Sequence, residues 1–298
     1  MSQKSIAVIG AGKWGQAIHF AISKQQKCLI TNRTKKNIKN FVSLEEALSC
    51  EYLIITVPTQ AVGQWLKSSF KNNNQKIVVA SKGIEAKSGR FLKEIYEAFV
   101  KPDNLGFLSG PSFASEVMQS LPTAIVINST NKQLYDEFKD FFPPNIKCYY
   151  SDDIIGAEVA GAYKNVLAIA SGICDGLKLG NNARAALISR GLVEMRRFGN
   201  HFGAKDETFI GLSGAGDLFL TASSSLSRNY RVGLGISNNK TIDTIIKELG
   251  EIAEGIMTCK AITKLSKKFE IYCPIVWEVA LMIDGKSPQQ SLNDLLKS

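Results

Sequence analysis

Residues 5–15 read SIAVIGAGKWG, an apolar run that leads into Gly-x-Gly-x-x-Gly and then into a stretch with helical spacing. In such a strand–turn–helix unit, one glycine permits the tight turn and another lets the backbone approach a pyrophosphate. The third glycine lets helix and strand pack closely. The start of the helix offers free N–H groups and a partial positive charge to the phosphates. The stretch therefore predicts a dinucleotide-binding site at Gly10, Gly12 and Gly15.

The sequence beyond this stretch alternates short apolar runs with helical patterns, such as those over 14–24 and 89–100. The candidate strands are residues 5–10, 27–32, 52–58, 76–83, 105–111 and 123–129. Apolar strands separated by helices indicate a parallel sheet with both faces covered. The sequence therefore predicts an α/β fold that begins with a Rossmann-type, doubly wound and mostly parallel sheet.

The character of the sequence changes near Asp152. From Ile154 onward the chain is rich in Ala and Gly, shows helical spacing and contains no further convincing strand. We therefore expect an NAD(P)-binding Rossmann domain over residues 1–150. An all-helical C-terminal domain, which binds substrate and carries the catalytic residues, is expected over 151–298.

Composition and charge narrow the class of protein. Of the 298 residues, 45% are hydrophobic and 21% are charged, as in ordinary globular proteins. The net charge of +9 suits nucleic acid, an anionic membrane surface or a phosphorylated small molecule. The basic runs are short, far apart and not interleaved with aromatic residues, which argues against nucleic acid. The most apolar long stretch contains Glu158 and Lys164, which argues against membrane insertion. A phosphorylated small molecule is the expected partner.

The six cysteines are scattered, with no Cys-x-x-Cys pair and no histidine-rich spacing around them. This pattern indicates reduced thiols rather than disulfides, and it gives no metal site. Residues 1–4 run directly into the first apolar strand, without the features of a signal peptide. We expect a cytoplasmic protein.

The end of the second candidate strand bears on the choice of cofactor. An acidic residue there would select NAD by holding the ribose 2′-hydroxyl, but the sequence has Asn32 and Arg33. An arginine at this place can pair with a 2′-phosphate, which favours NADP(H). A solvated loop arginine and the use of both cofactors stay open.

Polar and glycine residues follow two other candidate strands. Lys82 lies at the carboxyl end of the candidate strand at 76–83 and is expected to point into the cleft at the carboxyl ends of the strands. Gly110 closes the candidate strand at 105–111, and Ser112 follows it. Ser112 is either a helix N-cap, which this motif alone favours, or a ligand of an oxygen-rich substrate.

The C-terminal half offers two further groups of polar residues. On a helix from Ile154, Lys164 shares its face with small residues, so either a ligand approaches it or it is a snorkelling surface lysine. Asp217 and Thr221 lie on one face if their segment is helical. The Ser-Arg-Asn stretch 227–229 suits a phosphate, although such a surface loop is common.

Together these residues resemble the bacterial NAD(P)-dependent sn-glycerol-3-phosphate dehydrogenase family over nearly the whole chain. The motifs that carry the resemblance are GAGKWG at 10–15, SKGIE at 81–85, SGPSFASEV at 109–117, PTA at 122–124, AYKNVLAIASGICDGL at 162–177, GAGDLFLT at 214–221, SRNYRVG at 227–233 and AEGIMT at 253–258. The resemblance implies interconversion of dihydroxyacetone phosphate and sn-glycerol 3-phosphate by hydride transfer with NAD(P)H. It also implies a supply of glycerol 3-phosphate for phospholipid synthesis, and a homodimer is plausible.

The resemblance also implies roles for individual residues. Lys164 matches the lysine that protonates the carbonyl oxygen, and Lys82 and Asp217 complete the catalytic set. The implied substrate-binding residues are Lys82, Gly110, Ser112, Lys164, Asp217, Thr221, Ser227, Arg228 and Asn229. The implied cofactor-binding residues are Gly10, Gly12, Lys13, Trp14, Gly15, Arg33, Lys82, Ala114, Arg228, Ile252 and Glu254.

These roles agree with the chemistry of the reaction. Hydride attack turns a ketone into an alkoxide, so a cation must be fixed where that charge develops. Burial and a second lysine would lower the pKa of Lys164, and Asp217 would oppose that shift and orient the amine. The chain departs from the family at Lys13, where a smaller residue is usual. We expect this extra positive charge to tighten phosphate binding.

Two other functions stay open. A β-hydroxyacid-type dehydrogenase also combines a Rossmann domain with a helical lysine, although its substrates bind through a carboxylate. A non-catalytic NAD(P) redox sensor has the same fold, because fold alone does not define function.

Overall fold

The computed structural model of the chain describes residues 4–250 and 253–297, which form two compact units. The first unit runs to Lys82 and continues from Leu92 to Ile154. The second consists of Gly83–Phe91 and the chain from Ile155 onward. The chain thus passes into the helical unit between Ile154 and Ile155, and a nine-residue segment, 83–91, belongs to that unit as well.

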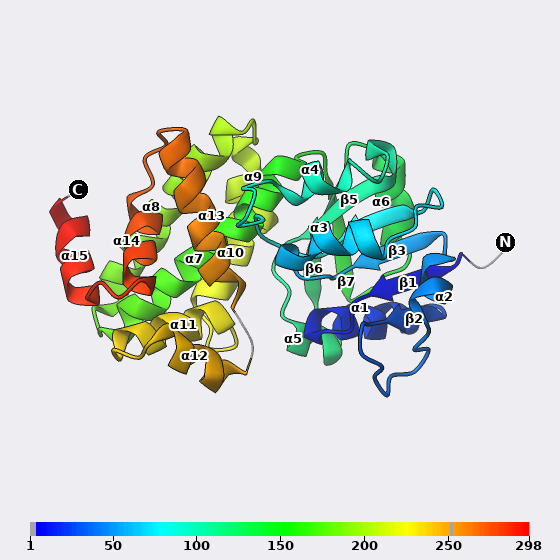
Figure 1. The fold of residues 1–298 in the computed structure, drawn as a ribbon, viewed down its shortest axis with the longest axis horizontal. Helices are drawn as coiled ribbons and strands as arrows, with labels where there is room; N and C mark the ends of the chain where they lie inside the picture. Colours follow the sequence, from blue (N-terminus) through cyan, green and yellow to red (C-terminus); the bar gives the residue numbers. More distant parts are fainter. Residues whose placement is uncertain (1–3, 251–252, 298) are drawn as a thin grey trace. The chain divides into compact units, whose positions relative to one another are not determined.

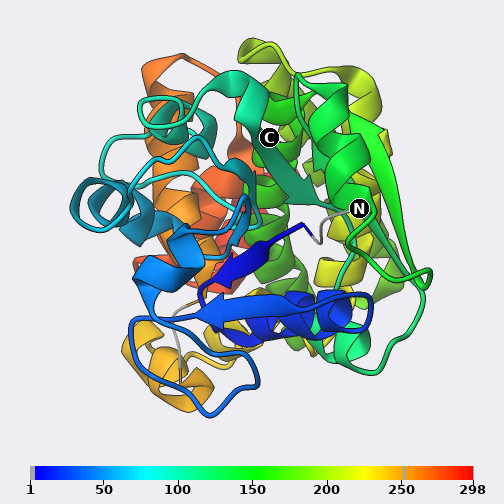
Figure 2. The ribbon, with the colours of Figure 1, turned by 90° about the vertical axis from the view of Figure 1, so that its right-hand side faces the viewer.

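The first unit is built on a seven-stranded sheet with the order β2-β1-β3-β4-β5-β6-β7 (Figures 1 and 2). Its strands are β1 (Ile6–Ile9), β2 (Cys28–Thr31), β3 (Tyr52–Ile55), β4 (Lys76–Val79), β5 (Leu105–Ser109), β6 (Thr123–Asn128) and β7 (Ile146–Ser151). All neighbours pair in parallel except β5 and β6. The predicted mostly parallel sheet is confirmed, and each of the six expected strands is present.

Short helices connect the strands. They are α1 (Lys13–Ser23), α2 (Leu44–Leu48), α3 (Thr59–Ser68), α4 (Leu92–Tyr96), α5 (Ala114–Met118) and α6 (Lys132–Lys139), with a 3₁₀ turn at Pro102–Asn104. Apolar side chains of β1 and β3 alternate between two core clusters, one on each face of the sheet. This two-sided burial explains why the strands read as continuous apolar runs. The helix expected over 89–100 is shorter, because residues 83–91 pack in the other unit.

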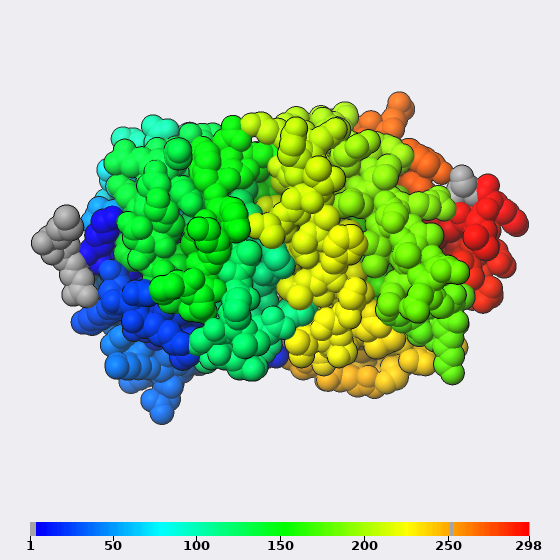
Figure 3. All heavy atoms as spheres, turned by 180° about the vertical axis from the view of Figure 1, so that it is seen from behind, coloured from blue at the N-terminus to red at the C-terminus, as the bar shows by residue number. Residues whose placement is uncertain are grey.

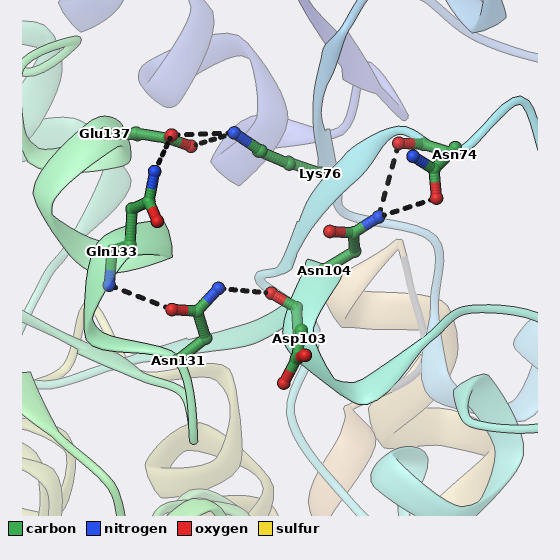
Figure 4. Close-up of polar contacts among 7 residues, drawn as sticks. All are labelled: Asn74, Lys76, Asp103, Asn104, Asn131, Gln133 and Glu137. Atoms are coloured by element: carbon green, nitrogen blue, oxygen red, sulfur yellow. Dashed lines mark hydrogen bonds and ion pairs between the residues drawn. The ribbon is translucent and has the colours of Figure 1, made fainter.

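A polar network fastens the amino-terminal ends of β4 and β5 (Figure 4). The Lys76 ammonium lies 2.6 Å from a carboxylate oxygen of Glu137 on α6. The Asn131 side chain accepts from the Gln133 N–H at the start of α6 and donates to the Asp103 carbonyl at 2.9 Å. These contacts lie at the end of the strands away from the glycine-rich turn, so they stabilise the sheet and leave its carboxyl end to ligands.

The second unit is helical, as predicted (Figure 1). Its helices are α7 (Ile154–Gly176), α8 (Gly180–His201), α9 (Asp206–Ile210), α10 (Asp217–Ala222), α11 (Arg228–Ser237), α12 (Ile242–Leu249), α13 (Glu254–Lys268), α14 (Pro274–Ile283) and α15 (Pro288–Lys297), with a π-helical turn at Leu212–Gly216. Helix α7 contributes many residues of the unit's core, such as Val159, Tyr163 and Val166. In the described parts of the chain, no helix is both long and apolar enough to cross a membrane.

Helices α7 and α11 cross at glycines. A Cβ atom at Gly172 would lie 2.0 Å from the carbonyl oxygen of Tyr230, and one at Gly233 would lie 2.0 Å from that of Ile169. Only glycine permits so close an approach of two backbones. This crossing fixes the start of α11, which carries the Ser-Arg-Asn motif, against the helix that carries Lys164.

Candidate active site

The glycine-rich turn between β1 and α1 has the geometry that its sequence predicts. Gly10 has a φ of +106°, and a Cβ atom at Gly15 would lie 1.9 Å from the Gly10 carbonyl oxygen. A Cβ atom at Gly12 would meet nothing within 4 Å. The first glycine thus makes the turn, the third permits close packing and the second faces open space. Helix α1 has no side-chain cap at its N-terminus, which suits an anion.

This turn opens onto a cavity of about 790 Å³ that lies wholly within the first unit. The cavity lies at the switch point of the sheet, because β1 continues to β2 on one side and pairs with β3 on the other. Its volume is in the range of small-molecule and cofactor sites. The lining includes Gly10, Gly12, Asn32, Arg33, Lys36 and Thr56. The geometry of the turn and the cations of the lining fit a dinucleotide.

Three side chains clamp Ala11, the residue between the first two glycines. Asn32 Oδ1 accepts from the Ala11 N–H at 3.1 Å. Gln16 Nε2 and Lys36 Nζ both donate to the Ala11 carbonyl oxygen, at 2.9 Å and 2.6 Å. The position where NAD enzymes carry a carboxylate is therefore an asparagine that braces the turn.

The remaining expected cofactor residues lie at helix starts. Lys13 and Trp14 are in the first turn of α1, Lys13 exposed and Trp14 partly buried against the sheet. Ala114 is the first residue of α5, and Glu254 is the first residue of α13 in the second unit. Ile252 lies outside the described residues.

Lys82, Gly110 and Ser112 gather beyond the ends of β4 and β5 in the first unit. The Lys82 ammonium and the Ser112 hydroxyl both donate to the Gly110 carbonyl oxygen, at 3.4 Å and 3.2 Å. Gly110 has a φ of +99°, where a side chain would be strained. The helix that follows has Phe113 as its N-cap and no side-chain cap, so the capping role for Ser112 is wrong. The Ser112 hydroxyl instead bonds backward to the turn.

The second unit buries an ammonium–carboxylate pair. The Lys164 side chain on α7 donates to Asp217 Oδ1 at 2.5 Å and to Thr221 Oγ1 at 3.1 Å. Thr221 Oγ1 lies 3.3 Å from Asp217 Oδ1, since both residues share one face of α10. Lys164 is only 7% exposed, and Asp217 and Thr221 are buried as well, so a snorkelling surface lysine is wrong. A cation held this deeply is costly without a partner, and Asp217 supplies that partner.

The Ser-Arg-Asn motif begins a helix rather than forming a surface loop. Ser227 is the N-cap of α11, where its hydroxyl accepts from the Tyr230 N–H at 3.3 Å, and Arg228 and Asn229 are the first two helical residues. Asn229 Oδ1 accepts from the Gly255 N–H at 3.0 Å. This bond fixes the orientation of the Asn229 amide and links the start of α11 to the start of α13.

Sequence reasoning did not find Lys36 or Thr56. Thr56 Oγ1 lies 3.1 Å from the Ile9 oxygen and 2.9 Å from the Gly10 oxygen, so it joins the end of β3 to the glycine-rich turn. Thr56 lies near the carboxyl end of the candidate strand at 52–58, which was a usable signal. Lys36 lies in a loop of several lysines, and only the fold separates it from its neighbours.

A Rossmann-type unit with a dinucleotide cavity, joined to a helical unit with a buried lysine–carboxylate pair, defines a nicotinamide-dependent dehydrogenase. Family models described as NAD-dependent glycerol-3-phosphate dehydrogenase, N-terminus and C-terminus, match residues 23–135 and 153–293. The chain belongs to the NAD-dependent glycerol-3-phosphate dehydrogenase family, and it is an oxidoreductase that uses NAD(H) or NADP(H).

Individual relatives agree with this membership. A glycerol-3-phosphate dehydrogenase [NAD(P)+] of Sulfurimonas denitrificans is 60% identical over 98% of this chain and 99% of its own length. One of Campylobacter jejuni subsp. doylei is 59% identical over 98% of both chains. The crystal structure of a glycerol-3-phosphate dehydrogenase from Coxiella burnetii is 33% identical, covers 99% of both chains and has a TM-score of 0.90. Family membership decides against the hydroxyacid dehydrogenase and the redox sensor.

Proposed function

We propose that this chain interconverts dihydroxyacetone phosphate and sn-glycerol 3-phosphate, with Lys164 as the proton donor and acceptor at the substrate oxygen. The observation that carries the proposal is the buried ammonium of Lys164, held 2.5 Å from Asp217 and 3.1 Å from Thr221. When bound, the nicotinamide cofactor supplies or accepts the hydride. The protein must then stabilise the charge on the oxygen and move one proton.

The Lys164 cluster suits that task. As the middle carbon of dihydroxyacetone phosphate gains a hydride, its carbonyl oxygen gains negative charge, which a fixed ammonium stabilises. Lys164 gives its proton to this oxygen and becomes a neutral amine. In the reverse direction the amine takes the hydroxyl proton. Asp217 and Thr221 orient the amine, so little reorganisation is needed during the reaction.

The phosphate of the substrate needs a cation and hydrogen-bond donors. We assign these to Arg228 and Asn229 at the start of α11, where the helix N-terminus adds a partial positive charge. Lys82, Gly110 and Ser112 in the first unit are assigned to the substrate and the nicotinamide end of the cofactor. Trp14, Ala114, Ile252 and Glu254 are assigned to the cofactor by their match to the family.

The test is the oxidation of NADPH and NADH on addition of dihydroxyacetone phosphate, with Lys164→Met beside the wild type. Loss of the general acid and of the fixed cation should lower kcat by about 10²–10⁴-fold. Cofactor binding, followed by the fluorescence of the reduced nicotinamide, should be unchanged. Lys260→Met, an exposed lysine of the same unit, is the matched control and should keep full activity. Absence of turnover in the wild type, or a fully active Lys164→Met, would refute the proposal.

We also propose a cytoplasmic homodimer that supplies glycerol 3-phosphate for phospholipid synthesis. All six cysteines are free thiols, in keeping with a reducing compartment. The second unit exposes Ile210, Phe219 and Leu226, on a stretch that is yellow in Figure 3, and such apolar side chains favour association. Light scattering of the purified protein should give twice the chain mass of 32.6 kDa.

A further inference from the structure

The loop between β2 and α2 extends away from the sheet after Thr31, and its far end is tied back to β2 (Figures 1 and 2). The Ile30 N–H donates to the Asn40 oxygen at 3.1 Å, and the Val42 N–H donates to the Ile30 oxygen at 2.9 Å. The Thr31 hydroxyl donates to the Val42 oxygen, also at 2.9 Å. The residues between Thr31 and Asn40 therefore form a loop whose two ends both lie at β2.

This loop carries cations and no carboxylate. Its charged residues are Arg33, Lys35, Lys36 and Lys39. Of these four charged residues, only Arg33 and Lys36 line the cavity. Lys35 and Lys39 are exposed, whereas Lys36 is partly buried. Of the three lysines, the fold thus places only Lys36 beside the cavity where a cofactor would lie.

The contact of Lys36 with the glycine-rich turn fixes its position. Its Nζ donates to the Ala11 oxygen at 2.6 Å, which uses one of the three donors of an ammonium. Asn32 takes the place of a ribose-binding carboxylate, but its amide is uncharged and is oriented by the turn and the loop, because its Oδ1 accepts from the Ala11 N–H and its Nδ2 donates to the Thr34 oxygen. Beyond the end of the second strand of a Rossmann unit lies the 2′ position of the adenosine ribose. Two cations, Arg33 and Lys36, follow this strand in the lining of the cavity, and the described lining contains no carboxylate.

We propose that Lys36 determines cofactor specificity: together with Arg33, it binds the 2′-phosphate of NADP(H) and makes the protein prefer NADP(H) to NAD(H). The guanidinium of Arg33 can bind a phosphate through two parallel N–H groups, and the Lys36 ammonium adds a second charge at a fixed distance from the turn. This inference rests on the proposed function, because it assumes that the cavity of the first unit holds the cofactor.

The test compares cofactors and fragments that differ only in the 2′-phosphate. Dissociation constants of NADPH and NADH come from nicotinamide fluorescence, and those of 2′,5′-ADP and 5′-AMP from calorimetry. Lys36→Gln should weaken NADPH and 2′,5′-ADP about tenfold, the size expected when a charged hydrogen bond is lost. It should change NADH and 5′-AMP less than twofold. Lys36→Arg should retain the preference, and Lys35→Gln, the neighbouring exposed lysine, should bind all four like the wild type.

Three outcomes would overturn the inference. An equal loss for NADPH and NADH in Lys36→Gln would mean that Lys36 acts only through the glycine-rich turn. An equal effect of Lys35→Gln would mean that the net charge of the loop acts, not the position of Lys36. A wild type that binds NADH as tightly as NADPH would remove the preference itself. If the wild type bound neither cofactor, the proposed function would fail, whatever the Lys36 variants did.

Discussion

Glu194 is a buried carboxylate that lies outside the proposed active site, with 2% of its surface exposed. It accepts from the Tyr163 hydroxyl at 3.0 Å and from the N–H groups of Ile275 and Val276 at 2.9 Å and 3.0 Å. Glu194, which lies on α8, therefore caps the start of α14. Through Tyr163, the residue before Lys164, it also links α14 to α7. Burial raises the pKa of its carboxyl, and the three donors only partly oppose that shift.

Because the pKa of Glu194 is raised in the folded state, the direction in which pH changes the stability of the fold is defined. The folded protein binds this proton more readily than the unfolded chain, whose carboxyl titrates near 4.5. The contribution of Glu194 to stability is thus largest below that pH and falls as the pH rises through the raised value. Glu194→Gln replaces the carboxyl by a neutral amide of the same shape, so its unfolding free energy should lie close to that of the wild type below about pH 4.5, where the folded wild-type carboxyl is also neutral. Urea unfolding should show that the wild type loses stability relative to the variant as the pH rises from about 4.5.

The exposed carboxylate of Glu207 provides the comparison. Glu207→Gln should change the unfolding free energy by less than about 0.5 kcal/mol at every pH. If the difference between the wild type and Glu194→Gln stayed constant with pH, the Glu194 proton would not be coupled to folding.

At the scale of secondary-structure elements, the α7–α11 crossing gives a sharp prediction. In Gly233→Ala, the new methyl would lie 2.0 Å from a backbone oxygen of α7, so the helices must move apart. Overpacking of this kind should cost about 1–3 kcal/mol of unfolding free energy. It should also raise the KM for dihydroxyacetone phosphate, because α11 begins with the proposed phosphate-binding residues.

A second glycine of the same helix serves as the control. In Gly235→Ala the nearest atoms, at 2.6 Å and 2.7 Å, belong to the buried side chain of Ile245 and not to a backbone, so a side chain must shift but the two backbones need not separate. Its thermal unfolding temperature should fall less than that of Gly233→Ala, and its KM should lie close to that of the wild type. Equal effects of the two substitutions would show that the crossing does not depend on the contact between backbones.

Most elements could be predicted from the sequence, because strands buried on both faces leave continuous apolar runs. Strand β7 was missed for the opposite reason. It pairs only with β6 at the edge of the sheet, and Lys147 and Tyr149 face solvent. The alternation of Ile146, Cys148 and Tyr150 was its only signal. Hydrogen bonds between distant residues, such as Asn229 to Gly255, leave no such periodic trace.

At the scale of the whole molecule, the residues 83–91 connect the two units in an unexpected way. Ile84 and Phe91 are bridged to each other and belong to the apolar core of the helical unit. A fragment that ends at Ile154 would expose both side chains to water. We expect this fragment to bind a hydrophobic dye and to aggregate. Replacement of Ile84 and Phe91 by serine should keep the fragment monomeric in light scattering. A fragment that is equally monomeric without these substitutions would contradict this expectation.

Contacts between distant parts of the chain limited what the sequence could predict about the site. The glycine-rich turn and the pair of Asp217 and Thr221 followed from spacing within one segment. The burial of Lys164 did not, because it depends on α10, more than fifty residues further along the chain. The position of Lys36 likewise depends on its contact with Ala11. Sequence patterns thus found the groups, and tertiary contacts decided which of them are held in place.

The segment 83–91 also has a consequence for the order of events during protein synthesis. Its apolar residues leave the ribosome before the helices that bury them have been made. At about 5–20 residues per second, the ribosome needs on the order of 10–40 seconds to finish the chain after Phe91. During this time the growing chain offers Ile84 and Phe91 to chaperones or to neighbouring nascent chains. Synthesis of the helical unit ends this period, so a ribosome stalled after β7 should leave a chain that needs chaperone protection.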